Sequence, residues 1–292
     1  MMKRQIRILI IALFMAASPA GLSQGFNAYD SFRDSPNRYQ GWRGGLSAGL
    51  ILGTVGGFYI FTRPIYYDEK SVPFHFSRHP DGHLTFFEND RRGLDKFGHI
   101  FSTSLFAQNI YFLSRWSGFS NKSASYLGAG LGIAIMTGME VHDGLYERWG
   151  FSVGDFLANI VGGVFPVAQQ NIPFLRHFDY KLSYHFTASQ TNDDTIEDYE
   201  NMTFWLTTNP AGLFAGRLPG WFPDFLNLAV GVGLTRHDTR EREIYISLDY
   251  RLKTIETRSV ILNQVIAALD RFHFPAPAIR VSPSFVGFGF FF

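Results

Sequence analysis

The sequence predicts a mostly α-helical protein, membrane-embedded or membrane-associated, in which a bundle of about four helices precedes a smaller C-terminal β-rich region. Three observations lead to this fold class: few charged residues, long apolar segments in the first part of the chain, and mixed aromatic and polar segments after Pro173. Charged residues make up 17% of the 292 residues, below the roughly 25% of an ordinary soluble domain. The domains that we expect are a signal peptide (1–23), a connecting arm (24–43), the helical bundle (44–172) and the β-rich region (173–292).

The composition excludes several classes of function. The 26 Lys and Arg nearly balance the 25 Asp and Glu, so the formal net charge of +1 gives no electrostatic reason to expect nucleic-acid binding. The sequence contains no Cys, which excludes disulfides, thiolate metal ligands and a Cys nucleophile.

Residues 1–23 are typical of a secretory signal, because Lys3, Arg4 and Arg7 precede an uncharged apolar run that small residues follow. The run is about half of the roughly 20 residues that span a bilayer. Cleavage after Ala20 or after Ser23 fits the pattern, and an uncleaved anchor helix is the alternative. Both readings predict export from the cytoplasm to the cell envelope.

Residues 44–62 contain no charged side chain and are long enough for a transmembrane helix. Glycine recurs at every fourth position, namely Gly45, Gly49, Gly53 and Gly57. Small residues on one stripe let helices approach closely in lipid, whereas each glycine would cost a water-exposed helix about 1 kcal/mol. The pattern therefore favours a bilayer helix over a glycine-rich loop or strand.

Three further helices are predicted over residues 95–114, 123–140 and 152–169. The second has small residues four apart at Gly128 and Gly132, and the third opens with a capping-box pattern from Ser152 to Asp155. Short connections predict antiparallel neighbours, and hence a bundle.

The C-terminal part has strand-like segments at 178–186 and 203–207, and a predicted helix near 257–272. The clearest strand covers 244–253, where apolar and polar residues alternate strictly, as in a half-buried strand. The aromatic residues at 288–292 resemble the termini that close outer-membrane strands. About five strand candidates are nevertheless fewer than the eight of the smallest membrane barrels.

Ionisable residues occupy the predicted helices at positions where apolar ones are expected. Asp95 and His99 lie four residues apart and so share a face, with Lys96 beside them. The next helix ends in Glu140, His142 and Asp143. If the helices alternate in direction, these groups converge with those that begin the last helix, Asp155 and Asn159. Such groups are costly at membrane depth and are candidates for function.

Two chemistries suit this cluster, and a structural role is the alternative to both. Carboxylates and imidazole could bind a divalent metal, the cofactor we would expect, with ligands drawn from Asp95, His99, Glu140, Asp143 and Asp155. Without a metal, acid and base catalysis would use Asp95, Lys96, His99, Glu140 and Asp155. In the structural reading, Glu140 and Lys96 form an ion pair and Asp155 only caps its helix.

The motifs Asp95-Lys96-Phe97-Gly98-His99, Glu140 with Asp143, and Trp149-Gly150-Phe151-Ser152-Val153-Gly154-Asp155 with Asn159 resemble those of the YfiM-like family. Its members are predicted bacterial periplasmic (lipo)proteins of unknown function. More distantly, the motifs resemble VanZ-like membrane proteins. Segments such as Leu218-Pro219-x-Trp221 and Phe274-Pro275-Ala276-Pro277 are similar to the longer Bacteroidetes-type members. The resemblance implies an envelope location but no activity, and without Cys we expect residues 44–62 to replace a lipid anchor.

Three functions remain open from the sequence, and it does not decide whether the protein is an enzyme. The favoured one is a structural or binding protein of the cell envelope. The second is a metal-dependent or acid/base membrane hydrolase that acts on a lipid or cell-wall intermediate. The third is an outer-membrane protein. Membrane lipid is the expected partner, and the inner membrane or its periplasmic face is favoured over the outer membrane.

Overall fold

The computed structural model describes residues 38–87, 92–185, 198–215, 217–235, 241–255, 257–258, 260–284 and 286–291. The predicted signal peptide and most of the predicted connecting arm lie outside these residues. The described chain forms two compact units that divide between Val167 and Ala168. We call them the helical unit and the sheet unit and describe each by itself.

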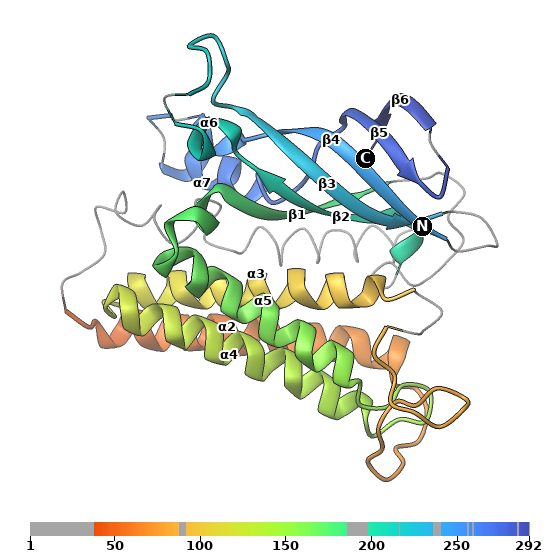
Figure 1. The fold of residues 1–292 in the computed structure, drawn as a ribbon. Helices are drawn as coiled ribbons and strands as arrows, with labels where there is room; N and C mark the ends of the chain where they lie inside the picture. The colour runs from red at the N-terminus through yellow and green to blue at the C-terminus, as the bar shows by residue number, and fades with distance from the viewer. Residues whose placement is uncertain are drawn as a thin grey trace. The chain divides into compact units, whose positions relative to one another are not determined.

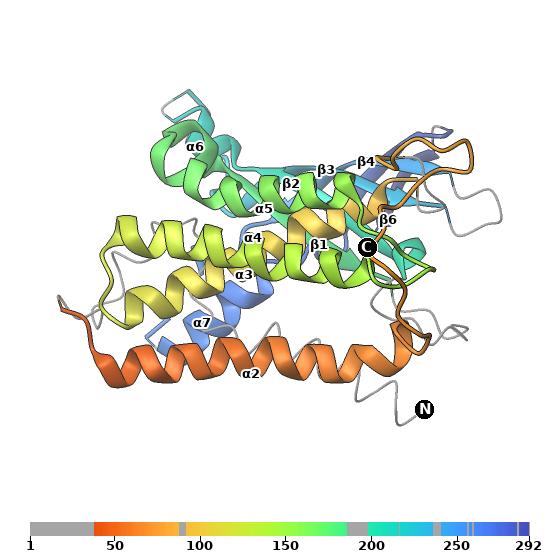
Figure 2. The same ribbon diagram turned by 90° about the horizontal axis from the view of Figure 1, so that it is seen from below.

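The helical unit contains α2 (Gly41–Tyr66), α3 (Leu94–Trp116), α4 (Asn121–Asp143) and most of α5 (Val153–Asn171) (Figure 1; Figure 2). All four were expected from the sequence, with boundaries that differ by a few residues. Helix α4 begins at an N-cap, where the Ser120 hydroxyl accepts a hydrogen bond of 3.1 Å from the backbone N–H of Ser123.

Helices α3 and α4 pack closely because small residues line their contact. A Cβ on Gly128 would lie 2.3 Å from the carbonyl oxygen of Ala107, and one on Gly132 would lie 2.9 Å from the Ala107 nitrogen. Helix α5 approaches α3 in the same way, since a Cβ on Gly162 would lie 2.4 Å from the carbonyl oxygen of Ile100. Larger side chains at these glycines would force the backbones apart.

Helix α2 contacts α3 near one end, where the Ser47 hydroxyl lies 3.0 Å from that of Ser117, but most of its apolar surface is exposed. A Cβ on Gly45, Gly49, Gly53 or Gly57 would meet no atom of the described chain within 4 Å, so the predicted glycine stripe has no packing partner there. Within the described residues, α2 over Gly41–Pro64 and α4 are the two helices long and apolar enough to cross a membrane.

The sheet unit is built on a six-stranded antiparallel sheet whose strands follow chain order (Figure 1). The strands are β1 (Phe178–Tyr184), β2 (Met202–Thr208), β3 (Leu226–Leu234), β4 (Arg242–Tyr250), β5 (Ala276–Ser282) and β6 (Val286–Phe291). Helix α7 (Val260–Leu269) connects β4 to β5, while α6 (Pro210–Leu213), η2 (Pro173–His177), η3 (Tyr199–Asn201) and η4 (Leu252–Thr254) are short.

At Leu182, the outer edge of β1 is paired with the segment that follows α7. The backbone N–H of Leu182 donates to the carbonyl of Arg271 at 3.1 Å, and that of His273 donates to the carbonyl of Leu182 at 3.0 Å. Beside this edge the His273 ring stacks on Trp205 with centroids 3.8 Å apart. Because the Trp205 indole also lies over β3, a Cβ on Gly231 would be 2.5 Å from its ring, and glycine fits there.

The prediction of a mostly helical bundle with a smaller β-rich region is wrong. The β part is substantial, because six paired strands organise the chain from Phe178 to Phe291. The helices do not form a bundle of four, because α2 leaves most of its surface unpacked. The sequence pattern underestimated the sheet because β3 and β5 lack clear alternation, and it could not show whether α2 packs.

Candidate metal centre

The start of α3 carries two buried ionic groups. Asp95 lies in the first turn, and the ammonium of the next residue, Lys96, is 2.8 Å from its carboxylate. The same ammonium is 2.9 Å from the carboxylate of Asp155 in the first turn of α5. A Cβ on Gly154 would lie 2.8 Å from the Lys96 side chain, so glycine leaves the room that this pairing needs.

One turn further along α3, His99 faces carboxylates from two other helices. Its Nε2 lies 3.5 Å from Oε1 of Glu140 on α4 and 3.8 Å from Oδ1 of Asp155 on α5. One potential ligand atom from each of the three residues lies within 4.8 Å of the others. Glu140 and Asp155 are buried, and the His99 side chain is 18% exposed.

Neighbouring polar groups fix the orientation of all three side chains. The Oδ1 of fully buried Asn159 accepts from the Thr103 hydroxyl at 2.9 Å and lies 3.0 Å from Nδ1 of His99. With Asn159 oriented in this way, Nδ1 of His99 must donate, so in the neutral ring the lone pair is on Nε2, toward the carboxylates. Metal-binding histidines usually donate the hydrogen of their other ring nitrogen to an acceptor in this way.

The turn before α5 positions the two carboxylates. The backbone N–H of Ser152 donates to Oε2 of Glu140 at 3.3 Å. The Ser152 hydroxyl accepts from the backbone N–H of Asp155 at 3.2 Å, which is half of the predicted capping box. Asp155 is thus both a first-turn residue of α5 and a partner of Lys96 and His99.

Burial and nearby negative charge act most strongly on Glu140. Burial, followed by the charges of Asp155 and Asp143, raises the pKa of Glu140 to about 9. At neutral pH the carboxyl group of Glu140 therefore keeps its proton unless a cation binds beside it. Burial also tends to raise the pKa of Asp155, but His99 and Lys96 outweigh it and the pKa lies below its ordinary value.

Lys96 remains charged in this environment. Burial alone would lower the pKa of Lys96, but the carboxylates of Asp155 and Asp95 outweigh it and raise the pKa above its ordinary value. The centre thus contains one fixed positive charge that partly offsets its carboxylates.

The structure brings Asp95, Lys96, His99, Glu140 and Asp155 together, with Asn159 beside them. Asp143 is not one of the residues whose ligand atoms are grouped: its carboxylate accepts a hydrogen bond from the Tyr67 hydroxyl, although its charge acts on Glu140. Thr103 was not singled out from the sequence, although it lies one turn beyond His99 on α3. No signal separates this threonine from other polar residues of the helix.

A second group of potential metal ligands lies in the loop before α3. Asp81 Oδ1 lies 2.7 Å from Nδ1 of both His79 and His83, whose rings are stacked with centroids 4.8 Å apart. The hydrogen bond from His79 is the largest cause of the lowered pKa of Asp81. The alternation of His, Asp and His over residues 79–83 is a signal that sequence reasoning could have used. The group is much more exposed than the centre at His99.

Residues 85–170 match the model of a family described as "Predicted periplasmic lipoprotein (DUF2279)". The match contains every residue of the candidate centre at His99, so this part of the chain is similar to an envelope protein family of unknown function. No curated protein and no solved structure matches the chain. The likenesses to YfiM-like and VanZ-like proteins stay predictions.

Proposed function

We propose that the protein is a cell-envelope protein whose helical unit binds one divalent cation through His99, Glu140 and Asp155. The observation that carries this proposal is the spacing of their ligand atoms. At 3.5 and 3.8 Å, the nitrogen–oxygen distances are longer than good hydrogen bonds. They are close to the separation of about 3.4 Å between ligands of a tetrahedral ion bound at about 2.1 Å.

The charges of the centre also favour a cation. In neutral His99 the Nε2 lone pair would face two carboxylates, an arrangement that only a shared proton or a cation stabilises. The high pKa of Glu140 comes from its burial and from the charges of Asp155 and Asp143, both of which a bound cation would offset. A divalent ion would displace the proton and accept the lone pair of the imidazole, as metal binding generally releases protons.

The donor set points to a class of ion rather than to one element. One imidazole and two carboxylates suit zinc, manganese or iron better than calcium, which prefers oxygen ligands. The buried donor Nδ2 of Asn159 makes no hydrogen bond to the described residues and could hold a water bound to the ion. Hydrolysis of a lipid or cell-wall intermediate would require such a water, and this activity stays a prediction.

We also propose that α2 attaches the protein to a membrane. Apolar side chains project from all along this helix into the surroundings, including Leu46, Leu52 and Ile60, which are 49–74% exposed. Such a surface is unfavourable in water. The family description places related proteins in the periplasm, where a membrane-attached chain without a lipidated Cys needs another anchor.

A structural role of the cluster is the competing function, and Lys96 supports it. Its ammonium bridges Asp95 on α3 and Asp155 on α5 at 2.8 and 2.9 Å, which could hold the two helices together without a metal. If the role is structural, replacing His99 should change the free energy of unfolding but should not change the affinity for a metal ion.

The two functions are separated by titration of chelator-treated protein with zinc and with manganese. We expect one ion to bind per chain, binding to be lost in His99→Ala, and affinity to fall by about 10- to 100-fold in Asn159→Ala. The matched control is His142→Ala, because His142 lies at the end of α4 and contacts Tyr59 rather than the centre. Equal affinities of wild type and His99→Ala, with both folded, would contradict the proposal.

A further inference from the structure

The sheet has an inverted distribution of polarity. Along β4, Ile244 and Ile246 are 37% and 51% exposed, whereas Tyr245 and Ser247 between them are 7% and 3% exposed. An antiparallel sheet in water normally turns its apolar residues toward the core and its polar residues toward solvent. Strands β3 and β4 do the opposite, because they expose Leu228, Val230, Ile244 and Ile246 and bury the small or polar residues Asn227, Ala229 and Ser247.

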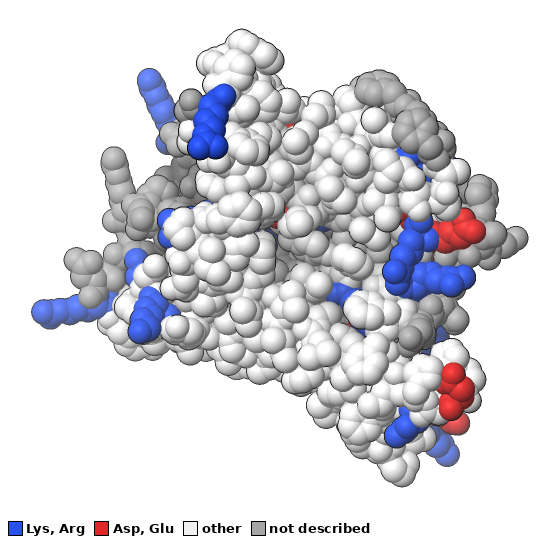
Figure 3. Space-filling model, viewed as in Figure 1, with Lys and Arg blue, Asp and Glu red and all other residues white. Residues whose placement is uncertain are grey.

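The exposed apolar residues form one continuous surface. The strand register aligns Leu206 of β2, Val230 of β3, Ile246 of β4 and Ile279 of β5 in a single row across the sheet. We call this row with its exposed neighbours the apolar sheet face, made of Leu206, Leu228, Val230, Ile244, Ile246, Ile279 and Val281. In Figure 3 the surface over β2–β4 is almost entirely uncharged.

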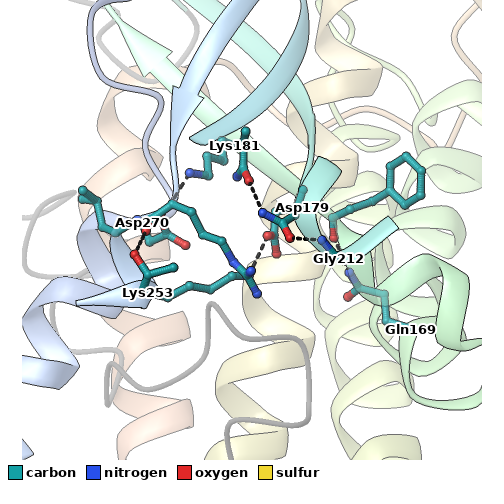
Figure 4. Close-up of polar contacts among 12 residues, drawn as sticks. Gln169, Asp179, Lys181, Gly212, Lys253 and Asp270 are labelled. Atoms are coloured by element: carbon teal, nitrogen blue, oxygen red, sulfur yellow. Dashed lines mark hydrogen bonds and ion pairs between the residues drawn. The ribbon is translucent and has the colours of Figure 1, made fainter. Parts of the chain in front are cut away.

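The opposite face of the sheet carries buried charged groups (Figure 4), beside an apolar cluster of Trp205, Ala229 and Tyr245. The ammonium of Lys181 on β1 lies 2.8 Å from the carboxylate of Asp249 on β4 and 3.2 Å from that of Asp270 after α7. All three side chains are fully buried. The ammonium of Lys253, also largely buried, lies 2.6 Å from Asp179. Ion pairs thus hold the charged groups on the buried side of the sheet, and the exposed apolar residues of the other face need another environment.

The two ends of the apolar sheet face differ, since one end exposes aromatic residues and the other exposes charged ones. At the end where β3 begins, Trp221, Phe225 and Phe214 are exposed, Trp221 by 79%. The backbone N–H of Arg251 donates to the carbonyl of Phe225 at 2.7 Å, which holds this aromatic loop beside the end of β4. At the other end, Glu241 and Arg242 are exposed. Exposed Trp and Phe next to an uncharged apolar band are typical of the membrane–water interface.

We propose that the apolar sheet face lies against the acyl chains of a phospholipid membrane. A layer of hydrocarbon explains the inverted polarity, the lack of charge and the aromatic border together. The hydrogen bonds between Leu182 and residues 271 and 273 pair the middle of the edge strand β1, where lipid would otherwise leave these backbone groups without partners. A second copy of the chain would cover the apolar row but gives no reason for the exposed Trp221. The proposal does not depend on the metal centre.

The absence of Cys from the sequence makes the test direct, because single cysteines can be introduced for nitroxide labels. The full chain is reconstituted into vesicles of phosphatidylethanolamine and phosphatidylglycerol with a label at Val230→Cys or Ile246→Cys. The matched control is Glu241→Cys, which is exposed at the end of the same sheet. Collision rates with oxygen and with a water-soluble nickel chelate are then compared by electron paramagnetic resonance.

We expect labels at positions 230 and 246 to be accessible to oxygen and shielded from nickel by several-fold relative to the label at 241. Equal nickel accessibility at 246 and 241 would overturn the proposal. So would dipolar broadening between labels at 246 that disappears on dilution with unlabelled chain, since it would identify a second copy. Circular dichroism shows whether each variant folds. Treatment with a chelator should leave the difference in nickel accessibility between positions 246 and 241 unchanged. The experiment therefore tests membrane contact of the sheet independently of the proposed metal centre.

Discussion

Which nitrogen of His99 carries a proton decides what the centre can bind. Asn159 and Thr103 hold the Nδ1 side of the ring, so Nε2 is left to face Glu140 and Asp155. The same residues in a different arrangement, with Nε2 held by the amide, would offer no ligand to a cation. The role of His99 thus depends on a hydrogen bond that it donates to Asn159, a residue 60 positions away.

The high pKa of Glu140 predicts a pH dependence for the metal-free protein. Because the pKa of Glu140 is about 9 in the folded state and 4.5 for an ordinary glutamate, the unfolded chain loses this proton first as pH rises. The contribution of protonated Glu140 to the free energy of unfolding is fully present below pH 4.5 and is lost as pH rises toward 9. The free energy of unfolding falls by up to about 1.4 kcal/mol per pH unit in this range. Glu140→Gln, which cannot ionise, should flatten this decline in chelator-treated protein.

Urea unfolding of chelator-treated protein between the two pKa values measures the effect. Glu147→Gln is the matched control, since Glu147 is exposed in the turn after α4. If wild type and Glu140→Gln lose stability in parallel as pH rises, Glu140 is ionised in the folded protein and the account of its environment fails.

The sequence could predict part of this centre. Asp95 and His99 share a helical face by spacing alone, and alternating helix directions brought Glu140 and Asp155 to them. Asp143 lies three residues beyond Glu140 but forms a hydrogen bond with Tyr67. Spacing could not show this, because the contact depends on how α4 is rotated about its axis. The role of Thr103 depends on the same long-range geometry.

At the scale of elements, the contact between α3 and α4 depends on glycines that differ in their surroundings. A Cβ on Gly128 would lie 2.3 Å from the Ala107 carbonyl, whereas one on Gly130 would meet no atom of the described chain within 4 Å. We expect Gly128→Ala to destabilise the fold by about 1–3 kcal/mol through overpacking. We expect Gly130→Ala to be neutral or stabilising by up to about 1 kcal/mol, from helix propensity.

Chemical denaturation in detergent gives the free energies of both variants. Since the two positions lie on the same helix and carry the same substitution, propensity cancels in the comparison. Equal stabilities of Gly128→Ala and Gly130→Ala would mean that α3 and α4 do not approach as closely as described.

An alternating pattern can predict a strand correctly without showing which side of the strand is buried. Strand β4 was expected from its strict alternation, but the pattern alone does not say which set of side chains is buried. Strand β3 was missed because its buried positions hold Asn227, Ala229 and Gly231, which alternate weakly with Leu228 and Val230. Gly231 is required by the Trp205 ring on the neighbouring strand, a contact that no local pattern encodes.

At the scale of the whole molecule, the prediction of the fold class was wrong because composition does not distinguish buried apolar residues from exposed ones. In α3 and α4 they pack against each other, whereas in α2 and on the apolar sheet face they point outward. Low charge and many aromatic residues predicted contact with lipid, but not that apolar side chains of a large sheet would also be exposed. The charged network around Lys181 was missed because its members are spread from β1 to the end of α7.

Membrane attachment through α2 predicts how the full chain fractionates. The protein should stay in the membrane pellet after an alkaline carbonate wash, because α2 exposes apolar surface along its length. Leu52→Lys combined with Ile60→Lys should release a larger fraction, since both side chains are more than 70% exposed on α2. Complete recovery of the wild type in the wash would contradict attachment.

The central claim is tested most directly by the metal content of the purified full chain, measured by inductively coupled plasma mass spectrometry. We predict close to one divalent ion per chain in the wild type and in His142→Ala, and its loss in His99→Ala. A wild type without metal, or equal metal in the wild type and His99→Ala, would contradict a centre formed by His99, Glu140 and Asp155. The latter result would direct attention to the exposed group at His79, Asp81 and His83.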